Sequence, residues 1–295
     1  MVNSIVSTRP PRLIRLATEA SVAVAIILLL VKGAVYFKSQ SLAILSTALD
    51  SGLDVVASVM NLVAVRIAYS PADDDHHFGH GKAEPLAGLA QTLFMGVSST
   101  LLLVMSVQDL IHPTPIRNID WGLAVVIGST LVTLVLVEFQ RRVLKSRYSV
   151  AVSADRLHYS SDIFLNLGVI ASLVLGYYSG IHAIDAIFGI GVAVYMGFGA
   201  WRILLESWHN LMDGELPDAA RVDITKICME HPEVMGVRNI RTRSSGSFPH
   251  IQLDLEMDGS LTLDRAHAIG EAVEKLLLQN YPEAQIIIHH EPSSG

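Results

Sequence analysis

The sequence predicts a membrane protein in which a long helical part is followed by a small soluble α+β domain. Hydrophobic residues make up 51% of the 295 residues and charged residues only 17%, whereas about a quarter of a soluble globular domain is charged. The charges are also divided unevenly. Residues 1–212 contain 14 acidic and 14 basic side chains, and residues 213–295 contain 14 acidic and 7 basic ones. We therefore expect a neutral membrane domain, 1–212, and an acidic domain, 213–295.

Two classes of protein are excluded by simple counts. A net charge of −7 does not fit a protein that binds nucleic acid through a general basic surface. The single cysteine, Cys228, cannot form a disulfide framework within the chain or supply several thiolates to a zinc ion.

Six stretches of the chain are long and apolar enough to cross a bilayer, which requires about 20 mostly apolar residues. They are residues 13–37, 42–68, 85–111, 119–141, 150–178 and 183–209. Lys and Arg are concentrated before the first stretch and after the second and fourth. The positive-inside rule therefore places both termini and the acidic domain in the cytoplasm.

The acidic domain has the pattern of a small αββαβ fold. Helices are expected at 218–230 and 263–279, and strands at 234–242, 250–257 and 285–289. Residues 250–256 alternate between polar and apolar side chains, as in a half-buried strand. Apolar side chains in 266–277 recur every three or four residues, as in an amphipathic helix. The order predicts a sheet with helices on one face.

Ionisable side chains inside the predicted spans indicate function, because burying them in a bilayer costs several kcal/mol. Asp50 and Asp54 lie in the second span, and His158 and Asp162 lie in the fifth. Each pair is spaced i, i+4 and therefore shares one helix face. At a rise of about 1.5 Å per residue, both pairs fall near the same depth. Three carboxylates and one imidazole could form a tetrahedral site for a divalent metal; the alternative is isolated polar groups used in helix packing.

Two further groups of polar side chains could bind metal. The loop after the second span contains three aspartates and three histidines between residues 73 and 80, a combination that is unusual for a simple solvated charge run. The alternative is a loop that docks onto the helix ends. In the acidic domain, His289 could lie beside His267, with His250 and Asp254 nearby, although ordinary surface histidines are the competing explanation.

Together, these residues resemble the cation diffusion facilitator family over nearly the whole chain, and its bacterial ferrous-iron/zinc efflux branch in particular. The most specific features are the Asp50-x₃-Asp54 and His158-x₃-Asp162 pairs, the run Phe78-Gly79-His80-Gly81-Lys82-Ala83-Glu84 and Leu211-Met212-Asp213. The resemblance implies six transmembrane helices followed by a metallochaperone-like, ferredoxin-type cytoplasmic domain for metal sensing and dimerisation.

The resemblance also implies roles for individual residues. Asp50, Asp54, His158 and Asp162 would form the transport site, Asp73, His76 and His80 the loop site, and Lys82 and Asp213 a charge interlock between the domains. His267, His289 and Glu291, together with Asp254, would form the cytoplasmic metal site. Arg238 and Asp254 stand where this branch has histidines. Because Arg cannot ligate a metal, the second metal of that site is in question.

The expected function is export of a divalent metal by proton antiport, with no enzymatic activity and no organic cofactor. The resemblance favours Zn²⁺ or Fe²⁺, both as substrate and as regulatory ligand, and the ligand types also admit Cd²⁺, Mn²⁺ or Co²⁺. Metal and protons compete for the same ligands. His158 is the expected proton carrier, because imidazole titrates near neutral pH. The expected form is a homodimer in the bacterial inner membrane, interacting with lipid, metal ions and protons but not with nucleic acid.

Two other classes of function were weighed. An intramembrane metalloprotease would also carry His and Asp in its spans, but the sequence contains no His-Glu-x-x-His motif and no evident general base. A metal sensor or assembly scaffold with a transporter fold is the second alternative. Such a protein would bind metal in its C-terminal domain without transporting it, and the complete four-ligand set argues against it.

Overall fold

The computed structural model of the chain describes residues 11–39, 42–111, 120–179 and 183–293. Residue 119, the predicted start of the fourth span, lies outside the described residues, as do the chain ends 1–10 and 294–295 of the two predicted domains. The chain divides into two compact units. One contains Pro10–Ile67 and Ala83–Trp208, and the other contains Met1–Arg9, Ala68–Lys82 and His209–Gly295. The loop 68–82 thus belongs to the same unit as the C-terminal residues.

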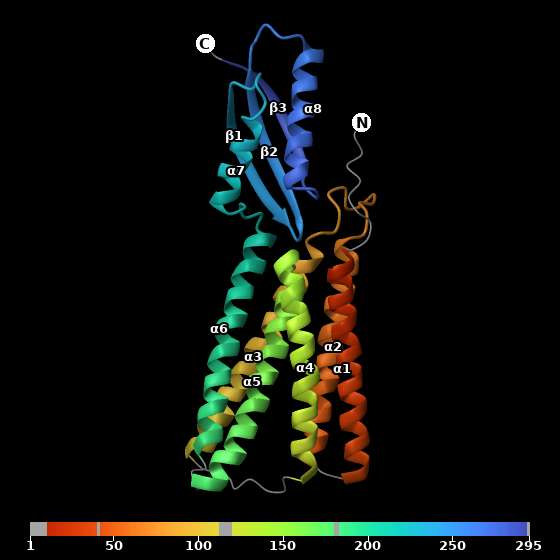
Figure 1. Ribbon diagram of the computed structural model, residues 1–295, viewed down its shortest axis with the longest axis vertical. Coiled ribbons are helices and arrows are strands. Elements are labelled where there is room, and N and C mark those ends of the chain that lie inside the picture. The colour runs from red at the N-terminus through yellow and green to blue at the C-terminus, as the bar shows by residue number, and fades with distance from the viewer. Residues whose placement is uncertain (1–10, 40–41, 112–119, 180–182, 294–295) are drawn as a thin grey trace. The chain divides into compact units, whose positions relative to one another are not determined.

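Six long helices make up the first unit, in the order that the hydrophobic stretches predicted. They are α1 (Arg12–Ser39), α2 (Leu42–Ala68), α3 (Ala83–Ile111), α4 (Asp120–Ser146), α5 (Val150–Ser179) and α6 (Ala183–Leu211). Figure 1 shows them running roughly parallel to one another as a bundle. Sequential helices run in opposite directions.

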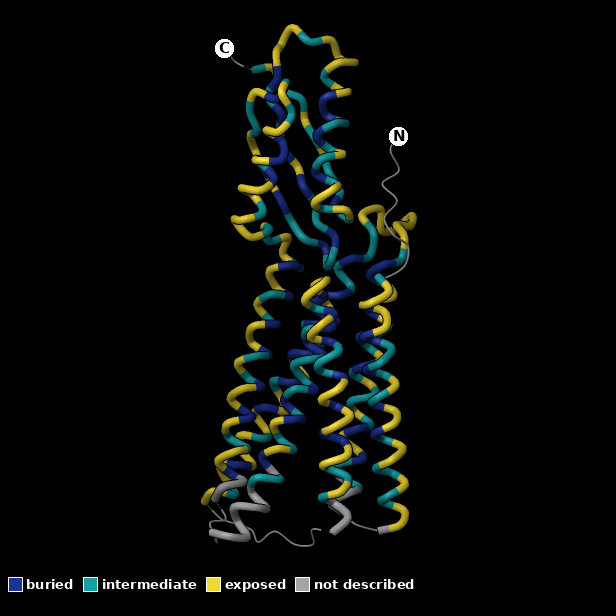
Figure 2. The backbone as a smooth tube through the Cα atoms, in the orientation of Figure 1, coloured by how far each residue is buried: buried dark blue, intermediate teal, exposed yellow. Residues whose placement is uncertain are grey.

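This unit buries polar side chains together with small and apolar ones, and its exterior carries large apolar side chains. Leu30, Leu53 and Val135 are 65%, 68% and 73% exposed, whereas Asn61 and Gln140 are buried. Exposed residues follow the outer sides of the helices in Figure 2. An apolar exterior around a polar interior is the arrangement expected of helices that face lipid, because interhelical contacts in membranes use small and polar side chains.

Among the described residues, five helices are long and apolar enough to cross a membrane: α1, α2, α3, α4 and α6. The chain is thus a multi-pass membrane protein. Helix α5 is not among these five; its first half contains Asp155, Arg156 and Asp162. These charges place ionisable groups among apolar helices.

The C-terminal domain has the αββαβ order that the sequence predicted. Its elements are α7 (Asp218–Cys228), β1 (Gly236–Ser245), β2 (Phe248–Met257), α8 (Leu263–Asn280) and β3 (Gln285–Pro292). The sheet has the order β1-β2-β3. Strand β2 pairs with β1 in antiparallel fashion and with β3 in parallel fashion. The connection through α8 permits the parallel pairing, which a tight turn does not allow.

Both helices of this domain cover the same face of the sheet. The core joins Ile224 of α7 and Val273 and Leu277 of α8 to Leu253 and Leu255 of β2. Successive side chains of a strand point to opposite faces, so the other face carries the polar residues of the alternating pattern. This alternation decides which histidines of the domain share a face.

Candidate metal centre

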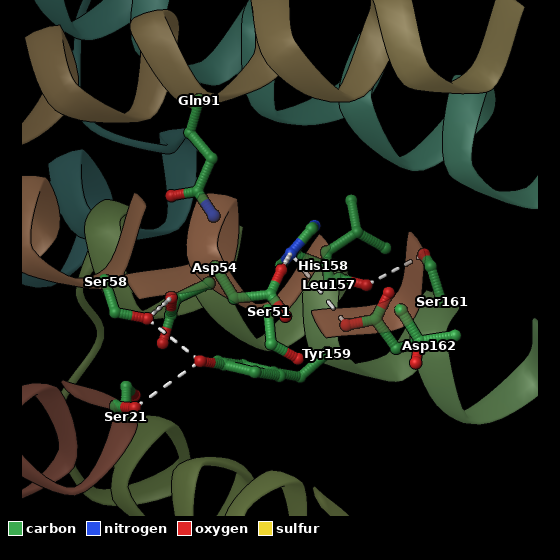
Figure 3. Close-up of polar contacts among 12 residues, drawn as sticks. Ser21, Ser51, Asp54, Ser58, Gln91, Leu157, His158, Tyr159, Ser161 and Asp162 are labelled. Carbon is green, nitrogen blue, oxygen red and sulfur yellow. Dashed lines mark hydrogen bonds and ion pairs between the residues drawn. The ribbon is translucent and has the colours of Figure 1, made fainter. Parts of the chain in front are cut away.

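Three of the four predicted transport ligands come together between α2 and α5. One ligand atom each of Asp54, His158 and Asp162 lies within 4.8 Å of the others. His158 Nε2 is 2.8 Å from Asp54 Oδ1 and 3.8 Å from Asp162 Oδ2. Figure 3 shows the three side chains grouped around the imidazole. All three side chains are partly buried, so the group is shielded by the helices while remaining accessible.

Leu157, the residue before His158, packs against α6. A Cβ atom at Gly199 of α6 would lie 2.6 Å from Leu157 Cδ2, so a larger residue there would require the Leu157 side chain to move. Leu157 immediately precedes His158, and its backbone carbonyl also accepts a hydrogen bond from Ser161 Oγ at 2.9 Å. On α5, the i, i+4 spacing then brings Asp162 to the same side as His158.

Asp50, the fourth predicted ligand, lies one helical turn before Asp54 on α2 and is exposed in this unit. It is not part of the 4.8 Å group. The side chain of Lys32 on α1 reaches the same turn of α2, where its Nζ donates to Ser51 Oγ at 2.8 Å and to the Thr47 carbonyl at 3.2 Å. The end of the site nearer to Asp50 therefore contains an ammonium group.

A second buried carboxylate, that of Asp155, lies one turn before His158 on α5. It is 2% exposed and accepts hydrogen bonds from Gln140 Nε2 at 2.7 Å and from Asn61 Nδ2 at 3.3 Å. Ser58 Oγ is 3.5 Å from the same carboxylate and 2.9 Å from the Tyr159 hydroxyl. These bonds join α2, α4 and α5 through their polar interior.

The network extends to two more helices. Gln140 Nε2 also donates to Ser21 Oγ on α1 at 3.0 Å, and Asn61 Nδ2 donates to Gln91 Oε1 on α3 at 2.5 Å. The sequence interpretation missed Lys32 and Asp155, although both are ionisable residues inside the predicted spans 13–37 and 150–178. The rule that selected the other intramembrane charges could have selected these two as well.

The loop brings its three predicted ligands together. Asp73, His76 and His80 each offer a ligand atom within 4.8 Å of the others. His76 Nδ1 is 3.1 Å from Asp73 Oδ1, and His80 Nε2 is 3.3 Å from Asp73 Oδ2. The backbone N–H of His76 donates to Asp73 Oδ1 at 2.7 Å and is the main cause that holds the pKa of Asp73 below its ordinary value. A turn at Gly79, with φ of 80°, returns the chain towards Asp73.

The predicted charge interlock pair is in contact within the second unit. Lys82 Nζ lies 3.0 Å from Asp213 Oδ1 and donates to the Leu211 carbonyl at 3.2 Å. Arg243 of β1 donates to the same Asp213 oxygen at 3.0 Å, a partner that the sequence interpretation did not include. Lys82 and then Arg243 hold the pKa of Asp213 below its ordinary value. One carboxylate thus joins the loop to the end of the β1–β2 hairpin.

Acid should weaken this junction. Because the folded-state pKa of Asp213 is lowered, its contribution to stability is complete above the unfolded value of about 3.9 and is lost as pH falls through the folded value. We expect Asp213→Asn to lower the apparent melting temperature of the full chain by about 1–3 °C at pH 7, as for a partly exposed ion pair. The difference between the two proteins should close as acid protonates Asp213. A difference that persists unchanged at pH 3 would contradict this origin.

The predicted cytoplasmic ligands do not form a comparable group. His289 and Asp254 are paired across β3 and β2, on the face of the sheet away from α7 and α8. His267 lies on α8, where its side chain is 70% exposed and its Nε2 is 3.5 Å from Glu271 Oε1. Glu291 is paired with Glu256. Within the described part of this domain, no three His, Cys, Asp or Glu side chains converge as closely as in the loop.

Arg238, one of the two departures from the resemblance, occupies the same polar face of the sheet. It is paired with Asp254 across β1 and β2, and its Nε lies 2.6 Å from Glu256 Oε1. Asn239, which has a positive φ of 47° at the irregularity of β1, donates to Asp254 Oδ2 at 2.6 Å. Both acidic side chains are therefore engaged by neighbours on β1.

Comparison with known proteins agrees with this architecture. Residues 19–212 match the family model of the cation efflux transmembrane domain, and residues 216–293 match that of the cation efflux protein cytoplasmic domain. The cation-efflux pump FieF of Salmonella arizonae is 42% identical over 283 residues, which are 96% of this chain and 94% of that protein. FieF of Salmonella choleraesuis has the same identity and coverage.

Among solved structures, a nickel form of the MamM CTD is 23% identical, with a TM-score of 0.26, and covers 26% of this chain and 100% of that chain. The two family models together cover most of the sequence, and the pump is similar over nearly its whole length. The chain therefore belongs to the cation diffusion facilitator family of cation efflux transporters.

Proposed function

We propose that this protein exports a divalent metal ion from the cytoplasm in exchange for protons. The observation that carries the proposal is the group of Asp54, His158 and Asp162, whose ligand atoms lie within 4.8 Å of one another between helices with apolar outer surfaces. A carboxylate-rich site of this kind suits a divalent cation, and its location inside a transporter bundle suits a substrate rather than a structural ion. Asp50 completes a four-ligand set when its side chain turns towards Asp54.

The ligand types favour Zn²⁺ or Fe²⁺ as the substrate. Three carboxylates and one imidazole combine hard oxygen ligands with a borderline nitrogen, so Cd²⁺, Mn²⁺ and Co²⁺ are also accommodated. Metal binds His158 only in its neutral form, and protons bind the same nitrogen. His158 then carries protons inward after the metal leaves, which couples metal export to the proton gradient. No covalent chemistry on the substrate is involved, so the protein acts as a transporter and not as an enzyme.

The proposed topology has six spans within residues 1–212 and a cytoplasmic domain, 213–295, in the bacterial inner membrane, with both termini in the cytoplasm. In a homodimer, Asp73, His76 and His80 would form a loop metal site, and Lys82 with Asp213 would transmit changes between the loop and the C-terminal domain. Their 3.0 Å contact supports this role. Bound cations would also reduce the repulsion between two acidic domains.

A regulatory metal site in the C-terminal domain is the weakest element of this arrangement. His289 and Asp254 face one side of the sheet and could share a metal with Glu291, whereas His267 is exposed on α8. A second protomer would have to bring the two groups together. Arg238 and its partner Glu256 replace part of the ligand set with an ion pair.

Flux measurements in proteoliposomes test the proposed function. We expect Zn²⁺ and Fe²⁺ to move only when a pH gradient is imposed or generated, and each metal to cause a proton flux in the opposite direction. The series should include Cd²⁺, Mn²⁺ and Co²⁺, with Ca²⁺ as a control, because a site with an imidazole ligand should bind Ca²⁺ poorly. The same experiment with His158→Asp tests the metal choice, since an all-carboxylate site should gain relative activity with Mn²⁺.

The same assay distinguishes the alternative of a non-transporting sensor or scaffold. Such a protein would bind metal in detergent, yet its vesicles would show no metal flux under any pH gradient. If metal moves but protons do not move in the opposite direction, the protein exports metal and the proposed antiport mechanism is wrong.

A further inference from the structure

The feature with no role in the proposed mechanism is the lysine inside α1. Lys32 lies seven residues before the end of the helix, within a stretch that is apolar enough to cross the membrane. A lysine at such a position commonly extends its chain to the membrane surface. Here the ammonium instead bonds to α2, through Ser51 Oγ at 2.8 Å and the Thr47 carbonyl at 3.2 Å.

These two contacts place the ammonium beside the transport site. Thr47 and Ser51 lie on the turn of α2 that contains Asp50, and Asp54 follows one turn later. The positive charge interacts electrostatically with both Asp50 and Asp162. Lys32 does not donate to a metal ligand in any hydrogen bond of the described residues, so it acts on the site through its charge and through the position of α2.

The charges of the site show what this ammonium can do. Asp50, Asp54 and Asp162 together carry three negative charges when all are ionised, and a divalent ion leaves one of them uncompensated. An uncompensated charge among membrane helices is unfavourable. With Lys32 included, the ligand set carries two negative charges, which a divalent ion neutralises.

Two other charged groups lie outside the ligand set. Asp155, one turn before His158, accepts hydrogen bonds from the amides of Gln140 and Asn61. Arg15, which precedes Lys32 by almost five turns on α1, pairs with Glu19. Among the described residues of α1 to α6, Lys32 is thus the lysine or arginine that acts on the carboxylates of Asp50 and Asp162.

We propose that Lys32 is a charge-setting residue, which bonds to the turn of α2 around Asp50 and offsets one carboxylate charge so that the ligand set is neutral when it contains a divalent ion. This inference rests on the proposed transport function. A site without the ammonium would attract the metal more strongly and release it more slowly, which opposes transport, since a transport site must bind weakly enough to let its ion leave.

Lys32→Gln removes the charge and is the primary test. We expect its Zn²⁺ dissociation constant at the transport site to fall roughly tenfold or more, because a positive charge near the bound ion is lost, and its turnover in proteoliposomes to fall with it. Lys32→Arg keeps the charge and should bind Zn²⁺ as the wild type does. Ser51→Ala removes one hydrogen bond without changing any charge, and is the matched control for the helix contact.

The binding measurement must isolate the transport site from the loop. Titration calorimetry of each full-length variant is compared with that of the same variant carrying Asp54→Ala, and the difference is the binding that depends on the site. If the wild type itself shows no such difference and no flux, the proposed function fails. The inference about Lys32 fails alone if the wild type shows both the difference and the flux, but Lys32→Gln binds Zn²⁺ as the wild type does. It also fails alone if Ser51→Ala binds Zn²⁺ as tightly as Lys32→Gln does.

A second variant restores the charge after folding. Lys32→Cys, alkylated with 2-bromoethylamine, regenerates an ammonium of nearly the same length as lysine. The natural Cys228 is fully buried, and burial raises the pKa of its thiol to about 11, so it should react slowly. Alkylation with neutral iodoacetamide is the control, because both reagents remove the thiol, which could itself bind Zn²⁺. Zn²⁺ affinity should equal that of the wild type in the ammonium adduct and be tighter in the amide adduct. Equal affinities of the two adducts would overturn the charge-setting role.

Discussion

Asp54→Ala is expected to abolish metal-driven proton flux in proteoliposomes. Asp54 is the proposed ligand of α2 that contacts His158, with 2.8 Å between Oδ1 and Nε2, so its loss removes the contact between the proposed ligands of the two helices. Substitution of residues that only support a metal ligand lowers metal affinity or activity by about 10- to 100-fold. Loss of a ligand should therefore lower the initial rate by more than about 100-fold, measured with a pH-sensitive dye inside the vesicles.

The control for this experiment is an aspartate of similar chemistry outside the site. Asp74 is exposed in the loop and does not belong to either ligand group. Asp74→Ala should retain wild-type flux, and both variants should keep the melting temperature of the wild type in detergent. Proton flux that persists in Asp54→Ala, with a normal response to Zn²⁺ concentration, would remove Asp54 from the transport site.

Asp155→Leu is expected to cause the largest loss of stability. Leucine fills the space but removes the acceptor of one N–H of each of Gln140 and Asn61, whose amide groups keep only Ser21 Oγ and Gln91 Oε1 as acceptors. Buried donors without partners cost roughly 1–3 kcal/mol each in soluble proteins, and interhelical hydrogen bonds in membranes are somewhat weaker. We therefore expect a loss of about 2–4 kcal/mol, seen as a lower midpoint of thermal unfolding in detergent.

Two further variants, Asp155→Asn and Asp162→Leu, separate the loss of stability from the loss of transport. Asparagine keeps one acceptor oxygen and should lose less stability than leucine. Asp162 is a predicted ligand that is only partly buried, so Asp162→Leu should stop flux while unfolding near the wild-type temperature. Equal stability of Asp155→Leu and the wild type would show that the buried network does not hold the helices together.

The intramembrane site could be anticipated because its pattern is local. Asp50 with Asp54 and His158 with Asp162 each follow the helical i, i+4 spacing, and apolar residues on all sides mark the helices as membrane spans. Lys32 carries the same signal but was not selected. Its importance depends on a contact with Thr47 and Ser51 on another helix, which no spacing within α1 can show.

The network around Asp155 illustrates the same limit more strongly. Ser21, Asn61, Gln91 and Gln140 come from four different helices, and nothing in the sequence connects them. Their common property is one network: Asn61 and Gln140 donate to the Asp155 carboxylate, and they also donate to Gln91 and Ser21. Hydrogen bonds between helices depend on how each helix is rotated and packed, and the sequence of one helix does not show this.

In the C-terminal domain, the sequence was sufficient for the order of elements but not for the metal ligands. The αββαβ order follows from period-two and helical periodicities. The expectation that His267 and His289 meet required a sheet register and a choice of face. Within one protomer, His289 faces away from the helix layer to which His267 belongs, so the two could share an ion only through a second copy of the chain.

The sequence by itself determined that the protein is a membrane protein with a small αββαβ domain, and that α2 and α5 carry paired ionisable residues on one face, because composition and periodicity act over a single element. Only the tertiary structure decided that Asp54, His158 and Asp162 converge, that Lys32 bonds to the turn of α2 before Asp54, and that the loop of Asp73, His76 and His80 packs with the C-terminal domain through Lys82 and Asp213. These facts depend on contacts between residues distant in the chain, and such contacts exist only once the helices and the sheet have packed.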